Sequence, residues 1–194
     1  MNHAGLWDDI LKLVDVPGAV VAGGCLRDHF LGLEPKDIDV FIPCTSLEHW
    51  LEVKCGLMDK FYNKEQPAGG PYLWDLQEGK EYDCTDFDRD KNPLYGVLAG
   101  ELCGYEVNII ARTNHATPEE LVSMFDFGIL QSWYDGTKTH YTEAQMVDCL
   151  FRRATLMHDK HVQQSINRFL RFNTRNPGVL SLILLFETPY AIPE

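Results

Sequence analysis

The stretch of residues 20–42, VVAGGCLRDHFLGLEPKDIDVFI, constrains the fold of this chain more than any other segment. A short apolar run ends at Gly23-Gly24, a pair that permits a tight turn and the close approach of a ligand. Residues 25–31 then place apolar side chains at helical spacing. A helix that begins directly after a glycine pair offers free N–H groups and a positive dipole end, which suit a phosphate. The segment therefore predicts a strand, a glycine turn and a helix with an anion site at its start.

A second strand is predicted at residues 37–42, DIDVFI. Side chains alternate along a strand, so Asp37 and Asp39 share one face and the apolar residues share the other. Two neighbouring carboxylates repel each other unless a cation relieves them, and such a pair can hold a hard ion such as Mg²⁺ or Mn²⁺. A lone glycine pair is usually a turn, and a lone acidic pair is usually solvated surface. Their combination predicts a metal site at Asp37 and Asp39 beside a phosphate site.

In residue type and spacing, this segment resembles the signature of the nucleotidyltransferase superfamily that includes DNA polymerase β. It is most similar to the branch of tRNA CCA-adding enzymes and poly(A) polymerases, and its short chain looks like the small, phage-type members. The matching residues are Gly23, Gly24, Arg27, Asp28, Leu31, Gly32, Asp37 and Asp39. The resemblance implies that Gly23 and Gly24 line the triphosphate and that Asp37 and Asp39 hold the metal. It also implies that Arg27 and Asp28 shape the nucleotide site.

Two weaker resemblances lie downstream. Residues 124–135, MFDFGILQSWYD, resemble a strand of the same branch that begins Arg-Arg-Asp-Phe-Thr. Asp126 fits the aspartate and is predicted to contact the nucleotide, whereas Phe125 and Gly128 replace the family's arginine and threonine. Residues 166–172, INRFLRF, resemble the arginine-bearing helix that follows the catalytic head. This resemblance implies nucleotide contacts from Arg168 and Arg171.

The third carboxylate is the point at which this sequence departs from the family. Enzymes of this type use a further aspartate on a neighbouring strand to activate the acceptor hydroxyl. Residues 105–110, YEVNII, predict that strand, with Glu106 and Asn108 on one face. The family pattern falls on Asn108, which can bind a metal but cannot act as a general base. Three interpretations stay open: Glu106 supplies the charge from a displaced position, the enzyme works slowly with two acids, or the chain only binds nucleotides.

The composition of the chain argues against a membrane protein, a secreted protein and a protein that binds long nucleic acids. With 194 residues and 45% hydrophobic content, the chain can bury a core, and no apolar run long enough for a membrane span or secretion leader is visible. The six cysteines lack a C-x-x-C pair, which favours reduced thiols and a cytoplasmic location. A net charge of −12 argues against a broad basic surface for long nucleic acids. The basic residues beyond position 135 suffice for a nucleoside triphosphate or an RNA 3′ end. The oligomeric state stays open.

The pattern of elements predicts an α+β fold. We expect a small mixed sheet flanked by helices in a head at residues 1–150, with a short helical region at 151–194 packed on it. Helices are expected at 6–14, from Thr45 or Ser46 to about residue 55, from Thr117, and at 158–173. A hairpin is expected at 95–102 and 105–111, and the helix from Thr117 should lead into a strand that carries Asp126. Residues 63–72 and 78–93 are expected to be loops.

These expectations converge on Mg²⁺-dependent transfer of a nucleoside monophosphate from a triphosphate to an acceptor hydroxyl. An RNA 3′ end is one candidate acceptor. The alternatives are an adenylyltransferase that modifies a small molecule or a protein, and a degenerate nucleotide-binding module. All three require that Asp37 and Asp39 face the glycine turn and are not held by a permanent lysine or arginine partner.

Overall fold

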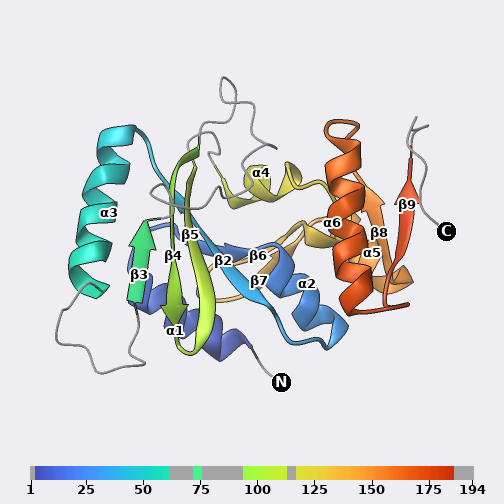
Figure 1. Cartoon of the computed structure of the whole chain (residues 1–194), viewed down its shortest axis with the longest axis horizontal. Coiled ribbons are helices and arrows are strands. Elements are labelled where there is room, and N and C mark those ends of the chain that lie inside the picture. The colour runs from blue at the N-terminus through green and yellow to red at the C-terminus, as the bar shows by residue number, and fades with distance from the viewer. Residues whose placement is uncertain (1–2, 62–71, 76–93, 113–116, 186–194) are drawn as a thin grey trace.

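The structure is a computed structural model, and its description covers residues 3–61, 72–75, 94–112 and 117–185 (Figure 1). The helices are α1 (Ala4–Val14), α2 (Gly24–Leu31), α3 (Leu47–Phe61), α4 (Pro118–Ser123), α5 (Glu143–Phe151) and α6 (Val162–Arg175). The strands are β1 (Val20–Ala22), β2 (Asp37–Pro43), β3 (Tyr72–Asp75), β4 (Leu94–Leu102), β5 (Tyr105–Arg112), β6 (Ser132–Tyr134), β7 (Thr139–Tyr141), β8 (Arg153–Leu156) and β9 (Ser181–Leu184). The predicted α+β class is confirmed.

One mixed sheet organises the chain. Its strand order is β3-β4-β5-β2-β1-β6-β7, and β8 and β9 form a separate parallel pair. Strand β2 runs parallel to β5 and antiparallel to β1, so β2 lies in the middle of the sheet. The predicted hairpin of β4 and β5 is confirmed.

The two faces of β2 have different surroundings. Ile38, Val40 and Ile42 are fully buried in the main core, together with Trp7 from α1 and Trp50 from α3. The opposite face carries the aspartates, and towards the far end of the strand it is covered by a smaller cluster. That cluster contains Val20, Ala22, Phe41, Val97, Ile110, Leu121 and Val122. The sheet therefore separates a conventional core from the face on which a site was predicted.

The starts of α1 to α4 lie within two residues of their predicted positions, with one choice resolved, whereas α6 begins at Val162, four residues after its predicted start. Ser46, rather than Thr45, caps α3, because its hydroxyl accepts the backbone N–H of His49. Thr117 and Glu120 form a full capping box at α4. Helix α3 continues to Phe61, past its predicted end. Of the predicted loops, residues 63–71 and 78–93 lie outside the described residues.

The continuous strand predicted around Asp126 is wrong. Phe127 forms only an isolated bridge with Leu156, and a 3-10 helix, η3 (Gly128–Leu130), follows before β6 begins. This turn points Phe127 and Ile129 into a second core with Leu156 and residues of α6. The chain therefore lacks the hydrogen bonds of a continuous strand here, and it buries two apolar side chains instead.

The second core joins elements from both sides of residue 150. Phe127, Ile129 and Leu130 pack with Ala154, Leu156, Val162, Ile166, Phe169, Phe172 and Leu180. The region after residue 150 contains the predicted helix, and it also contains the parallel pair of β8 and β9. The predicted boundary between head and C-terminal region stays a prediction.

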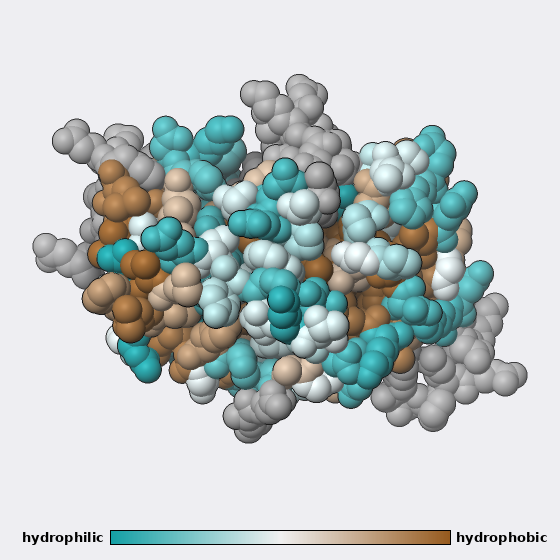
Figure 2. All heavy atoms as spheres, turned by 180° about the vertical axis from the view of Figure 1, so that it is seen from behind, coloured by the Kyte–Doolittle hydropathy of each residue, from teal (hydrophilic) through white to brown (hydrophobic). Residues whose placement is uncertain are grey.

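Apolar surface gathers at the end of the molecule formed by α5, β8 and β9, as the rear view shows (Figure 2). Met146, Leu150, Phe151 and Leu185 are exposed there, each by nearly half or more. No helix within the described ranges is both long and apolar enough to cross a bilayer.

The space around Gly128 explains why this chain has no threonine at that position. A Cβ atom there would lie 2.8 Å from Oδ2 of Asp148 and 3.3 Å from Cβ of Ala144. Asp148 is almost fully buried and accepts hydrogen bonds from the backbone N–H and hydroxyl of Thr155 and from Nε of Arg153. Because these bonds fix the carboxylate, it cannot move aside for a larger side chain.

We expect Gly128→Ala to lower the free energy of unfolding by about 1–3 kcal/mol, the usual result of overpacking. Chemical denaturation measures the change. Gly56→Ala on exposed α3 is the matched control, since no atom lies within 4 Å of its added Cβ, and it should be neutral or stabilising. An unchanged stability of Gly128→Ala would contradict the assignment of Asp148 as a rigid neighbour.

Candidate active site

The glycine pair forms a turn that leads directly into α2. Gly23 is the N-cap residue, with φ 85° and ψ −130°, a conformation that residues with a Cβ strongly disfavour. Gly24 begins the helix, and a Cβ there would lie 3.6 Å from Nη2 of Arg27. The predicted strand, turn and helix are confirmed, and the side chain of Arg27 lies close to the turn.

The register of β2 and β5 brings the four predicted catalytic residues together. Asp37 lies opposite Glu106, and Asp39 lies opposite Asn108. Paired residues of neighbouring strands point to the same face, so all four side chains leave the same side of the sheet. Nδ2 of Asn108 donates to Oδ1 of Asp39 at 3.0 Å. Asp39 also lies opposite Ala22, the residue before the glycine turn.

Asp39 has a strongly perturbed acidity. Burial raises its pKa to about 7, and the charge of Asp37 contributes to the rise. The hydrogen bond from Asn108 and the charges of Lys36 and Arg168 oppose this rise only in part. The pair therefore holds more negative charge than its surroundings balance, which is the condition that a bound cation would relieve.

The expected set of metal ligands is only partly preformed. Within the described part of the chain, no three His, Cys, Asp or Glu side chains converge as a metal cluster. Mg²⁺ commonly binds through one or two carboxylates, with water and substrate phosphates completing its shell. Two adjacent aspartates, of which Asp39 has a pKa raised by burial and then by the charge of Asp37, fit that mode. They do not fit a closed structural metal site.

Asp37 has a lysine neighbour, which bears on the condition that no lysine or arginine holds the aspartates permanently. Nζ of Lys36 lies 3.0 Å from Oδ2 of Asp37. The lysine side chain is 59% exposed, and exposed pairs of this kind contribute little free energy. A cation or a phosphate can therefore displace Lys36 at small cost, so the contact does not block the site.

Arg27 and Asp28, which the resemblance assigns to the nucleotide site, form an ion pair with each other. Nε and Nη2 of Arg27 both lie 2.7 Å from Oδ1 of Asp28. Asp28 is 7% exposed, and burial raises its pKa although Arg27 opposes the change. This pair orients the guanidinium at the start of α2.

Helix α6 contributes a second basic group. Nη1 of Arg168 lies 2.6 Å from Oδ2 of Asp126, so two residues predicted from separate segments meet. Oδ1 of Asp126 is buried without a hydrogen-bond partner. Arg171 is exposed further along α6, and its predicted nucleotide contact stays a prediction.

The structure adds two residues that sequence reasoning missed. Phe172 packs beneath Arg27, with its ring centroid 4.1 Å from the guanidinium carbon. The charge of Arg175 acts on Asp28 and opposes the rise that burial causes in the pKa of that carboxyl. The signal was available in the sequence, because Arg168, Phe172 and Arg175 have the spacing of one helix face.

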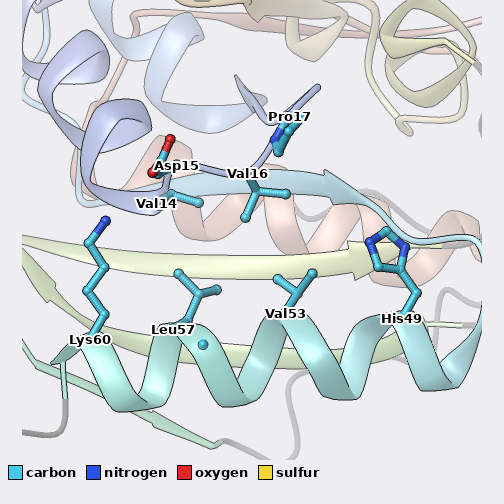
Figure 3. A pocket seen from close by; sticks show the side chains of 9 residues that line it. Val14, Asp15, Val16, Pro17, His49, Val53, Leu57 and Lys60 are labelled. Carbon is cyan, nitrogen blue, oxygen red and sulfur yellow. The ribbon is translucent and has the colours of Figure 1, made fainter.

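A separate pocket of about 390 Å³ lies between the end of α1 and α3 (Figure 3). Val14, Val53 and Leu57 line it, with His49 and Lys60 at its sides. Val14 and Leu57 belong to the main core, on the side of the sheet opposite the aspartates. The pocket contains none of the predicted site residues.

The fold with this arrangement is the fold of nucleotidyltransferase heads. A tRNA-processing enzyme in an apo form matches 93% of this chain with a TM-score of 0.57 and 16% identity, over 44% of its own length. A CCA-adding enzyme in complex with ATP matches 90% of this chain with a TM-score of 0.53 and 19% identity, over 38% of its length. The Thermotoga maritima CCA-adding enzyme complexed with tRNA matches 90% of this chain with a TM-score of 0.52 and 19% identity, over 37% of its length. The chain thus spans less than half the length of these enzymes, and the predicted fold resemblance is confirmed.

The sequence places the chain more narrowly. Residues 3–162 match the model of the Gabija anti-defense 2 family, and the chain belongs to that family. Comparison with curated proteins gives no match.

The perturbed acidity of Asp39 makes stability depend on pH. Its pKa is higher in the folded than in the unfolded chain, so the folded state binds more protons between about pH 4 and pH 7. Stability therefore falls as pH rises through that window. Asp39→Asn removes the ionisable group, and without divalent metal it should be more stable than the wild type at pH 8 by about 1–3 kcal/mol.

Denaturant unfolding in EDTA at pH 4 and pH 8 measures this difference. The two proteins should have similar stability at pH 4, where the wild-type carboxyl is protonated in the folded state. A variant that is less stable than the wild type at pH 8 would show that Asp39 has a stabilising cationic partner instead.

Proposed function

We propose that this protein is a nucleotidyltransferase that moves a nucleoside monophosphate from a triphosphate to an acceptor hydroxyl. Asp37 and Asp39 would hold Mg²⁺ or Mn²⁺. Gly23, Gly24 and Arg27 would bind the triphosphate. The observation that carries the proposal is the register of β2 and β5, in which both aspartates, Glu106 and Asn108 share one face next to the glycine turn.

The chain's own groups divide the work of binding between two helices. The backbone N–H groups at the start of α2 and the guanidinium of Arg27 offer donors to phosphate oxygens. Arg168 from α6, already paired with Asp126, supplies positive charge that acts on Asp39. When bound, the divalent ion would offset the charge of the triphosphate and of the departing pyrophosphate.

Transfer exchanges one phosphorus–oxygen bond for another. The acceptor oxygen bonds to the α-phosphorus while the bond to the pyrophosphate oxygen breaks, and the proton of the acceptor hydroxyl must leave. Glu106 is exposed on the same face, opposite Asp37, and can accept that proton. Asn108 cannot, and its amide instead holds Asp39 in one orientation through the 3.0 Å hydrogen bond.

Two candidate acceptors and one biological role follow from the comparisons and the charge of the chain. The solved enzymes include one complexed with tRNA, so an RNA 3′ end is the first candidate acceptor. The net charge of −12 favours the second candidate, a small molecule or protein. The family's name gives a role against the Gabija defence, and we propose that nucleotidyl transfer serves this role.

A second candidate function is nucleotide binding without transfer. The specific observation in its favour is that Asn108 occupies the place of a third acid and donates a hydrogen bond to Asp39. Binding of triphosphates by a protein that transfers no label under any condition would favour this reading.

We expect Asp37→Ala to abolish Mg²⁺-dependent transfer and leave the fold intact, because it removes a predicted metal ligand. Incubation of the wild type and the variant with each α-labelled triphosphate, total RNA and total protein, with Mg²⁺ or Mn²⁺, measures transfer and identifies the labelled acceptor. Asp9→Ala on exposed α1 removes the same charge far from the site and should transfer normally. Equal transfer by Asp37→Ala and the wild type would remove the proposed metal role.

Glu106→Gln should slow transfer by about two to four orders of magnitude, since it removes the proposed proton acceptor and keeps the size of the side chain. Single-turnover rates on the acceptor found in the screen measure the effect. Asn108→Asp is the companion variant. A near-normal rate for Glu106→Gln together with a faster rate for Asn108→Asp would place the base at the family position instead.

A further inference from the structure

The guanidinium of Arg27 is held by the carboxylate of Asp28 and the ring of Phe172. Oδ1 of Asp28 accepts a hydrogen bond from Nε of Arg27 at 2.7 Å and forms an ion pair with Nη2, also at 2.7 Å. The ring of Phe172 lies on one side, 4.1 Å from the guanidinium carbon. Gly24 adjoins the same group, since a Cβ added there would lie at an ordinary contact distance of 3.6 Å from Nη2. A long flexible side chain is thereby restricted to one position, with its remaining N–H groups available to a ligand.

Phe172 reaches this position from the far end of the chain. It lies on α6, 4% exposed, within the second core that also contains Phe169. Figure 1 shows α6 beside α2 and away from α3. The contact between Arg27 and Phe172 therefore connects the glycine turn to the packing of α6.

An aromatic ring under a guanidinium does more than fill space. The ring face attracts the cation and also limits its rotation, and a group that is already ordered loses less entropy when a ligand binds. A leucine would fill much of the same volume without holding the guanidinium plane. The contribution of Phe172 should therefore appear in anion binding and not only in stability.

We propose that Phe172 is a positioning residue that holds Arg27 for the polyphosphate part of the nucleotide, so that triphosphate binding depends on the docking of α6. Linkage makes the effect reciprocal, and a bound triphosphate strengthens the docking of α6. The inference rests on the proposed function, because it assumes that Arg27 contacts phosphate oxygens.

The test compares two phenylalanines of the same helix and the same core. Phe172→Leu should weaken binding of inorganic tripolyphosphate and of ATP about tenfold by calorimetry. Phe169→Leu is the matched control, because Phe169 is similarly buried but packs near Phe127 instead of Arg27. It should leave the tripolyphosphate affinity within about twofold of the wild type. Phe172→Tyr keeps the ring and should restore most of the affinity.

Hydrogen exchange provides the reciprocal measurement. Tripolyphosphate should slow exchange of the α6 amides in the wild type, and it should do so much less in Phe172→Leu. Because Phe172→Leu affects the core, its fold is checked by circular dichroism, and Phe172→Tyr tests the ring independently.

Three results would overturn the inference. Unchanged tripolyphosphate affinity in Phe172→Leu, with normal binding by the wild type, removes the positioning role and leaves the proposed function standing. Equal losses in Phe172→Leu and Phe169→Leu would show that only core packing matters. A wild type that binds neither tripolyphosphate nor any nucleoside triphosphate would overturn the proposed function and this inference together.

Discussion

The parallel pairing of β2 with β5 is the constraint on which the rest of the site depends. It places Asp37 beside Glu106 and Asp39 beside Asn108, and a shift of one residue would turn half of these side chains into the opposite core. Ile38, Val40 and Ile42 prevent such a shift, because each is fully buried on the other face. The chemistry-bearing face is thus held in register by the apolar residues between the acids.

Much of this arrangement could be predicted from the sequence. The glycine pair, the helix after it and the Asp-x-Asp strand follow from local rules, since turn propensity and alternation act over a few residues. The strand at residues 105–110 was correctly identified as a neighbour of the acidic strand. The continuous strand at Asp126 was wrong, because burial of Phe127 and Ile129 outweighed local strand preference. The contact of Phe172 with Arg27 was not predicted, because the helical spacing of Arg168 and Phe172 shows a shared face but not that this face packs against α2. The contact of Lys36 was not predicted either, although Lys36 adjoins Asp37 in the chain.

The departures from the family pattern have different physical grounds. Gly128 has no room for a side chain because the Asp148 carboxylate occupies it. Phe125 packs against the smaller cluster and Phe41, and its ring also lies beside the Gly23 turn, so apolar contacts hold it there. Asn108 is different, because it keeps a polar contact within the acidic face. Two of these departures therefore reflect packing, and the third changes the acid–base chemistry that the face can perform.

The second core has a practical meaning for anyone who trims this protein. A fragment that ended after α5 would keep every residue of the Gly-Gly and Asp-x-Asp segments. It would nevertheless strip Phe127, Ile129 and Leu130 of their apolar partners and remove Arg168 and Phe172 from the site. The smallest useful expression fragment therefore has to extend through α6, even though the Gly-Gly and Asp-x-Asp segments end far earlier.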